Sequence, residues 1–142
     1  MLMRNVSRDA VLTVTGHECG RPIQIRTVAA DFTEGQSIYS KIRTELQHIR
    51  VGILVNNVGM KLPIGLLVDV SSGDEFEDIV NCNVMSVARM TNLVLPSMRK
   101  NKRGVIINIG SIAGVGYAPM RTTYGATKVM STYSRAYIIK CT

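Results

Sequence analysis

The stretch VGILVNNVG, residues 51–59, decides the fold class of this chain. It is almost continuously apolar and then stops at two asparagines and a glycine. An unbroken apolar run of this length is typical of a parallel strand that is buried on both faces, whereas a strand with one face in water alternates apolar and polar residues. The segment GVIINIGS, residues 104–111, has the same form. Two such strands predict the parallel sheet of an α/β protein.

Helical periodicity separates the predicted strands. IQIRTVAA, residues 23–30, is β-branched and short, and predicts a further strand. Residues 33–49 have apolar side chains at helical spacing, and residues 74–98 carry acidic side chains in the first turn, where the helix dipole favours them. Residues 122–139 predict a third helix. This alternation predicts a Rossmann-like, doubly wound parallel α/β sheet in a single domain, residues 1–142.

Composition narrows the class of protein. The chain has 142 residues, of which 46% are hydrophobic and 19% charged, as expected of one folded domain. The formal net charge is +7, and the basic cluster RKNKR, residues 99–103, contains no aromatic residue. We interpret this cluster as a solvated helix end and turn, with contact to nucleic acid or to an anionic membrane as the alternative. We expect no nucleic-acid partner.

The cysteines and the hydropathy of the sequence indicate whether to expect a metal site and in which cellular compartment the protein lies. Cys19, Cys82 and Cys141 are far apart and match neither zinc nor disulfide spacing. We therefore expect no metal site and reduced thiols in an intracellular protein. No apolar run reaches the ~18 residues of a membrane span, and the start of the chain does not resemble a signal peptide.

Candidate functional residues follow the predicted strands. In open parallel sheets, ligands bind beyond the carboxyl ends of the strands. Asp31 follows the strand at 23–30, and Asn57 and Gly59 follow the strand at 51–57. A glycine at such a position lets a ring or a ribose approach the backbone closely.

A Ser-Tyr-Lys set accompanies the next strand and helix. Ser111 ends the strand at 104–111, and Tyr124 and Lys128 share one face of the predicted helix through their i, i+4 spacing. A phenol ordinarily titrates near pH 10, and a neighbouring ammonium favours its ionised form. The three side chains could therefore orient a carbonyl group and exchange a proton with it.

Four motifs occur in one order: NNVG, NCNVMSV, INIGS and YGATK, with 13 positions between Ser111 and Tyr124. In this respect the chain resembles the short-chain dehydrogenase/reductase family over roughly residues 20–137. The segments AADFT, GILVNNVGM and MTNLVLPSM are similar to the branch of 17-beta-hydroxysteroid dehydrogenases and very-long-chain 3-oxoacyl-CoA reductases.

The resemblance implies a catalytic role for four residues. Tyr124 would be the acid/base, and Lys128 would tune it and bind the cofactor ribose. Ser111 would bind the substrate carbonyl, and Asn83 would belong to a proton relay.

The resemblance also implies a nicotinamide cofactor, NADP, with NAD as the alternative. Asp31 would meet the adenine, and Asn57 and Gly59 the ribose side. Ser7 and Arg8 are similar to a Ser-Arg pair that meets the 2′-phosphate in NADP-preferring members, since an Arg fork suits that group. A surface arginine near a terminus is the alternative interpretation of Arg8.

As a function, the resemblance implies an NADP(H)-dependent oxidoreductase that interconverts a ketone and a secondary alcohol on a lipid-like substrate, a steroid or a fatty-acyl group. The alternative is a catalytically inactive, shortened paralogue or incomplete gene product that acts as a binding module. The resemblance leaves a homo-oligomer open. It implies the endoplasmic reticulum as location, and the cytoplasm would follow if the chain is complete as given.

The segment TGHECGRP, residues 15–22, is close to the T-G-x-x-x-G-x-G pyrophosphate loop that the family needs. Only 15 positions separate Gly16 from Asp31, too few for a βαβ unit of about 30 residues. Pro22 also replaces the last glycine. We therefore expect an incomplete sheet, in which the first strand and the C-terminal strands of the family have no counterpart. The strand ending in VNNVG would then leave backbone groups unpaired on one side, or it could pair directly with an earlier strand. In either case we expect the chain alone to bind no NADPH.

Overall fold

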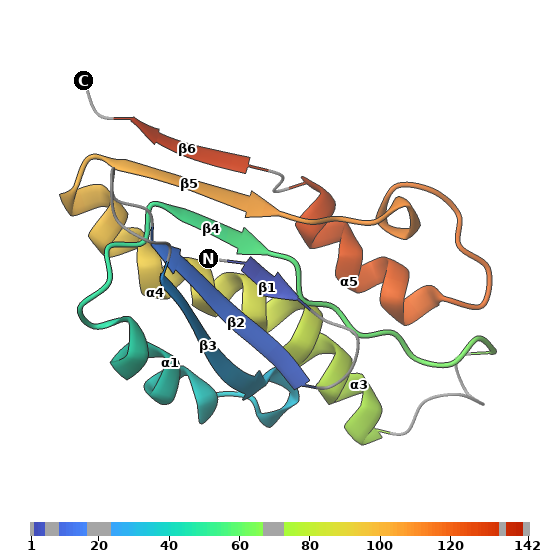
Figure 1. Cartoon of the computed structure of the whole chain (residues 1–142). Helices are drawn as coiled ribbons and strands as arrows, with labels where there is room; N and C mark the ends of the chain where they lie inside the picture. Colours follow the sequence, from blue (N-terminus) through green and yellow to red (C-terminus); the bar gives the residue numbers. More distant parts are fainter. Residues whose placement is uncertain (1, 5–8, 17–23, 67–72, 134–135, 141–142) are drawn as a thin grey trace.

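One six-stranded sheet organises the chain, in the order β3-β2-β1-β4-β5-β6 (Figure 1). The computed structural model describes residues 2–4, 9–16, 24–66, 73–133 and 136–140. The strands are β1 (Leu2–Arg4), β2 (Asp9–Gly16), β3 (Gln24–Asp31), β4 (Ile53–Asn56), β5 (Arg103–Asn108) and β6 (Ala136–Lys140).

Within the described residues, four α-helices and three short helical segments accompany the sheet. They are η1 (Phe32–Glu34), α1 (Ile38–Leu46), α3 (Gly73–Val80), η2 (Asn81–Met85), α4 (Ser86–Lys100), η3 (Ile112–Gly114) and α5 (Thr122–Tyr133). The helix predicted over residues 74–98 is confirmed as the continuous run α3-η2-α4. Its middle segment η2 is π-helical, a rare geometry that often marks functional positions.

The α/β fold is confirmed, and the sheet is mixed. β4 runs parallel to β5 and to β1. β2 runs antiparallel to both of its neighbours, and β6 runs antiparallel to β5. The length of the connection explains why β2 runs antiparallel to β3. A parallel pair needs a crossover of a dozen or more residues, whereas antiparallel strands need only a short loop. Only residues 17–23 separate β2 from β3.

The glycine-rich segment does not form the turn between a strand and a helix. Thr15 and Gly16 end β2, and Gly16 lies opposite Gln24 at the start of β3. They therefore lie at the amino ends of the parallel strands, away from the carboxyl ends where ligands bind. This confirms that the spacing of TGHECGRP excludes a βαβ unit, although residues 17–22 themselves lie outside the described part of the chain.

The helix predicted over residues 122–139 is correct only in its first part. α5 ends at Tyr133, and residues 136–140 form β6 along the edge of β5. The sequence of β6, AYIIK, is rich in aromatic and β-branched residues that suit a strand. The ladder with β5 satisfies backbone groups that this edge would otherwise leave unpaired.

The place beside β4 is taken by β1. Leu2 lies opposite Val55 in a parallel pairing, so the strand that ends in VNNVG pairs directly with the first segment of the chain, which is one of the two arrangements that the sequence leaves open. The hydrophobic core lies between the sheet and the helices α1 and α4, and its members include Val28, Ile42, Leu54, Met90, Val94 and Ile106. Among the described residues, no helix is both long and apolar enough to cross a membrane.

Candidate active site

Lys128 and Tyr124 meet at the carboxyl end of β4. α5 presents both side chains, and Lys128 is buried with only 5% of its surface exposed. Its Nζ donates to the carbonyl oxygen of Val58 at 3.4 Å and lies 6.0 Å from the centre of the Tyr124 ring. Gly59 makes this approach possible, because a Cβ at that position would lie 2.6 Å from Lys128 Nζ. The predicted i, i+4 pair therefore converges on the predicted glycine.

Burial sets the electrostatics of this pair. Desolvation lowers the pKa of Lys128, and the nearby Cys82 sulfur opposes that shift. Burial also raises the pKa of the Cys82 thiol to about 11, so the thiol is neutral near pH 7 and offers the ammonium little compensation. Desolvation therefore decides the direction in which the pKa of Lys128 shifts.

Asn83 ties the loop after β4 to α5. It lies in η2, is fully buried, and accepts a hydrogen bond from the backbone N–H of Met60 at 2.7 Å. Its Nδ2 donates to the Met60 carbonyl and to Thr127 Oγ1, each at 2.9 Å. Thr127 Oγ1 in turn donates to the Tyr124 carbonyl at 2.9 Å. The Asn83 side chain thus positions the helix that carries Tyr124, and its role in a proton relay stays a prediction.

Ser111 lies at the start of η3, where its Oγ accepts from the Ala113 N–H at 3.3 Å. Glycines let this turn approach α5 closely. A Cβ at Gly114 would lie 2.7 Å from the Lys128 carbonyl group, and one at Gly110 would lie 2.6 Å from Thr132 Oγ1. Ser111 is therefore held against the helix that carries Tyr124 and Lys128.

Thr132 joins Ser111 to Lys128. Its Oγ1 donates to the Lys128 carbonyl at 2.8 Å and lies 3.5 Å from the Ser111 N–H, which donates to it. The sequence interpretation missed both Thr127 and Thr132. The available signal was their spacing on α5, since a helical threonine commonly returns its hydroxyl to a carbonyl three or four residues earlier.

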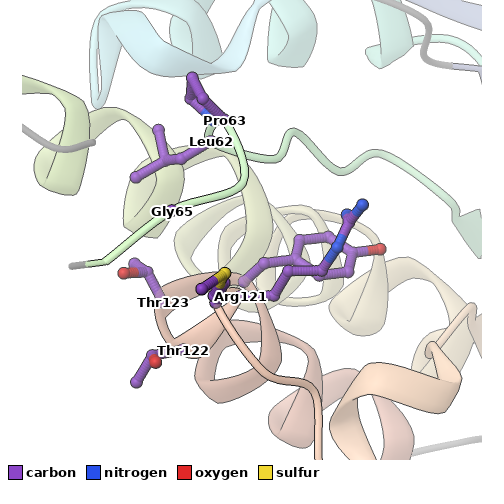
Figure 2. A pocket seen from close by; sticks show the side chains of 8 residues that line it. Leu62, Pro63, Gly65, Arg121, Thr122 and Thr123 are labelled. Carbon is purple, nitrogen blue, oxygen red and sulfur yellow. The ribbon is translucent and has the colours of Figure 1, made fainter. Parts of the chain in front are cut away.

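Two hollows border the site. The larger, about 490 Å³, is lined by the end of β5, by η3 and by α5; its residues are Ile107, Asn108, Ile109, Gly110, Ser111, Ile112, Val115 and Thr132. The smaller, about 20 Å³, lies between the loop after β4 and the start of α5, where Figure 2 shows Leu62 and Pro63 across from Arg121 and Thr123. That volume suits a water molecule. Tyr124 lines this smaller hollow and Ser111 lines the larger one, which has room for a substrate.

Asp31, Asn57 and Arg8 are the remaining predicted residues. Asp31 ends β3, and its Oδ1 accepts from the backbone N–H and the hydroxyl of Thr33, at 2.9 and 2.7 Å. β2 and β1 separate β3 from β4 in the sheet, and the charge of Asp31 adds to burial in raising the pKa of the Cys82 thiol. Asn57 directly follows β4 and is half-buried. Arg8 lies outside the described residues, and within them no three His, Cys, Asp or Glu side chains cluster as a metal site would need.

The model of the short chain dehydrogenase family matches residues 4–133. A mixed α/β sheet with the Asn83, Tyr124 and Lys128 cluster at its carboxyl edge agrees with that match, and the chain belongs to the short-chain dehydrogenase family. It is 41% identical to the very-long-chain 3-oxoacyl-CoA reductase of Anas platyrhynchos over 113 residues, which are 78% of this chain and 36% of that protein. It is 40% identical to the 17-beta-hydroxysteroid dehydrogenase type 3 of Rattus norvegicus over 117 residues, 80% of this chain and 37% of that protein.

A solved structure shares the architecture. The short-chain dehydrogenase from Sphingobium yanoikuyae in complex with NADPH superposes with a TM-score of 0.64 and 28% identity, over 73% of this chain and 40% of that one. The chain thus spans little more than a third of the length of the curated relatives that it matches.

Proposed function

We propose that this chain carries the reaction centre of an NADP(H)-dependent oxidoreductase that interconverts a ketone and a secondary alcohol. One observation carries the proposal: the buried Lys128 ammonium lies over the Tyr124 ring, on a helix that Asn83 anchors through Thr127. A structural lysine would reach solvent with its charged end, whereas this one is buried at the carboxyl edge of the sheet.

The residues fit the nicotinamide half of such a cofactor. Gly59 has no side chain where the backbone and Lys128 Nζ come closest, and Lys128 and Tyr124 would hold the ribose. The bound cofactor supplies a hydride. The choice of NADP rests on the NADPH complex of the Sphingobium yanoikuyae relative and on the resemblance of Ser7 and Arg8. Asp31 remains the proposed adenine contact.

The chain's own residues supply the proton chemistry. Ser111 Oγ uses a lone pair to accept from Ala113, which leaves its O–H available to donate to a substrate carbonyl. The Tyr124 hydroxyl would donate its proton to the same carbonyl oxygen. Lys128 would stabilise the resulting phenolate by its positive charge, an effect that burial strengthens because the local dielectric is low.

The proposed substrate is a fatty-acyl or steroid ketone. The hollow beside Ser111 is lined mainly by apolar residues, including Ile109, Ile112 and Val115, and the similar proteins are named for 3-oxoacyl-CoA reduction and hydroxysteroid dehydrogenation. Location in the endoplasmic reticulum and a homo-oligomer are further expectations from the resemblance, to be tested by imaging a tagged protein and by light scattering.

A binding module without turnover is the second candidate, and the position of β1 favours it. β1 takes the place beside β4 and leads through residues 5–8 into β2 rather than into a helix. The site therefore lacks, among the described residues, a helix N-terminus directed at the pyrophosphate.

One experiment separates the two candidates. Calorimetric titration with NADPH is followed by steady-state reduction of 3-oxoacyl-CoA and 17-ketosteroid substrates, with wild type and Tyr124→Phe. The proposed reaction predicts turnover that Tyr124→Phe lowers by about 10²–10⁴-fold, with NADPH affinity nearly unchanged. Wild-type turnover in the variant would remove Tyr124 from the mechanism. Absence of both NADPH binding and turnover in the wild type would favour the binding module.

A further inference from the structure

Arg121 occupies a position where a helix ordinarily has a capping residue. It directly precedes α5, and its carbonyl oxygen accepts from the backbone N–H of Gly125 at 2.8 Å, as the N-cap residue of a helix does. Asn, Asp, Ser and Thr are strongly preferred at this position. A cation is disfavoured there, because the amino end of a helix carries a partial positive charge. Helix formation therefore does not explain an arginine at this point of the chain.

The backbone around Arg121 is fixed by its neighbours. The N–H of Arg121 donates to the carbonyl oxygen of Ala118 at 3.2 Å, and the carbonyl oxygen of Met120 accepts from the N–H of Gly65 at 3.4 Å. Met120 has a φ of 55°, in the left-handed region that glycine adopts more readily than any residue with a side chain. The loop after β4 thus helps to hold the turn from which the Arg121 side chain extends.

The Arg121 side chain lines the small hollow that Tyr124 also lines (Figure 2). Leu62, Pro63 and Met120 contribute apolar surface, and of the described residues around this hollow only Arg121 is charged. Arg121 and Tyr124 are three positions apart, the spacing at which side chains along a helix are neighbours. The guanidinium therefore belongs to the immediate surroundings of the side chain that would exchange a proton with the substrate.

The two hollows accept different parts of one substrate. A ketone that meets both Ser111 and Tyr124 can place an alkyl chain in the larger hollow, where Ile109 and Ile112 provide apolar contacts. The other substituent of the ketone then faces the smaller hollow and Arg121. That space, about 20 Å³, holds about one water-sized group. An oxygen atom close to the ketone fits this space, and a second alkyl chain does not.

We propose that Arg121 selects substrates in which a second carbonyl group lies two carbons from the ketone, as in a 3-oxoacyl thioester. The proposal rests on the proposed function, because the ketone has to lie between Ser111 and Tyr124. The oxygen of the second carbonyl would accept from the guanidinium, which offers only donors, and a charged donor strengthens such a hydrogen bond. A 17-ketosteroid has no second oxygen at that separation. Arg121 would therefore favour the fatty-acyl substrates over the steroids.

A matched pair of ligands tests this. 3-Oxododecanoyl-N-acetylcysteamine has the second carbonyl and no phosphate, and 2-undecanone has the same ketone and alkyl chain without that carbonyl. Ligand-detected NMR titration of the 142-residue chain, with and without NADP⁺, measures both dissociation constants, and reduction with NADPH measures both kcat/KM values. The wild type should prefer the thioester. Arg121→Gln should weaken thioester binding about 10–100-fold and change 2-undecanone binding by less than about twofold.

Arg121→Lys keeps a cation but not the planar fork of donors, and should retain part of the preference for the thioester. Arg43→Gln is the matched control, because Arg43 is an exposed arginine on α1, and it should bind both ligands as the wild type does. Circular dichroism verifies that the variants are folded. If Arg121→Gln does not fold, the comparison of wild type with Arg121→Lys decides.

Three results would overturn the role of Arg121: a wild type that does not prefer the thioester, equal weakening of both ligands by Arg121→Gln, or the same loss with Arg43→Gln. Failure of the proposed function has a different signature. A wild type that binds the thioester selectively through Arg121 but reduces neither ligand would contradict the reaction and leave the binding role in place.

Discussion

Asn83 and Thr127 are hydrogen-bonded at 2.9 Å across a sequence separation of 44 residues. This bond joins the π-helical turn η2 to the middle of α5, and both side chains are buried. Because Asn83 also holds both backbone groups of Met60, a single carboxamide fixes three segments around the candidate reaction centre.

Removal of the Thr127 hydroxyl should therefore destabilise the fold. In Thr127→Val the shape is kept, but the Asn83 amide loses one acceptor in a buried place, which costs about 1–3 kcal/mol. Thr127→Ser keeps the hydroxyl and is the matched control. Urea unfolding of the three proteins provides the free energies, and a Val variant as stable as wild type would show that this bond contributes nothing.

A methyl group at Gly59 should disturb Lys128 more than the fold. The added Cβ would lie 2.6 Å from Nζ, the far end of a flexible side chain that can move aside. We expect Gly59→Ala to lower the unfolding free energy by less than about 1 kcal/mol while displacing Nζ from the Val58 carbonyl. Gly52→Ala, with nothing within 4 Å of the added Cβ, is the control. A crystal structure of each variant measures the displacement, and an unmoved Lys128 would contradict the prediction.

Gly114 should tolerate no side chain. A Cβ there would meet the backbone carbonyl group of Lys128 at 2.7 Å, and backbone atoms cannot move aside as a side chain can. Overpacking of this kind typically costs about 1–3 kcal/mol, and the turn that carries Ser111 should be pushed from α5. Gly116→Ala, whose Cβ would lie 3.8 Å from the Ile112 carbonyl oxygen, should stay near wild type. Thermal unfolding compares the two, and equal stability would refute the close packing of η3 on α5.

Lys128 should make stability depend on pH in the alkaline range. Its folded-state pKa is lowered from 10.5 by burial, so the desolvation penalty is fully present below the folded-state pKa. The penalty is relieved as pH rises through the folded pKa, and the relief is complete near 10.5. Lys128→Met lacks the penalty, so its stability relative to wild type should be greatest below the folded-state pKa of Lys128 and should decline as the pH rises toward 10.5.

Chemical denaturation at several pH values measures that difference. Because Tyr39 is present in both proteins, its own loss of stability at high pH cancels in the comparison. Cys82 interacts with Lys128, so both proteins are compared with Cys82→Ala as background. A difference that stays constant from pH 7 to 10.5 would show that Lys128 is not desolvated.

Apolar runs and helical spacing in the sequence predict those parts of the site that are set by a single strand or helix. Continuous apolar runs predict β4 and β5 and place Asn56 and Asn108 at their ends, where the two side chains are in fact hydrogen-bonded at 2.7 Å. The i, i+4 spacing predicts that Tyr124 and Lys128 converge. These predictions succeed because strand burial and helix periodicity are set within a few residues.

Which strands pair with one another is not set by local sequence, and this limits how much of the fold the sequence can predict. The end of α5 and the start of β6 are hard to separate in sequence, because Ala136–Lys140 continues an apolar pattern and becomes a strand only by pairing with β5. The direction of β2 likewise depends on its pairing with β3. The hydroxyls of Thr127 and Thr132 gain their roles from segments far away in the chain, so only the folded arrangement shows them.

Among the described residues, few register pairs join β1 to β4 at the middle of the sheet. Within this described part of the chain, eight register pairs connect β2 to β3 and four connect β4 to β5, whereas one pair, Leu2 with Val55, links β1 to β4. The β1-β2-β3 meander and the β4-β5-β6 half that carries the candidate reaction centre are therefore two units held together mainly by the hydrophobic core that they share. Local opening at this seam breaks few backbone hydrogen bonds, so amide protons of the two units should exchange with solvent on separate timescales.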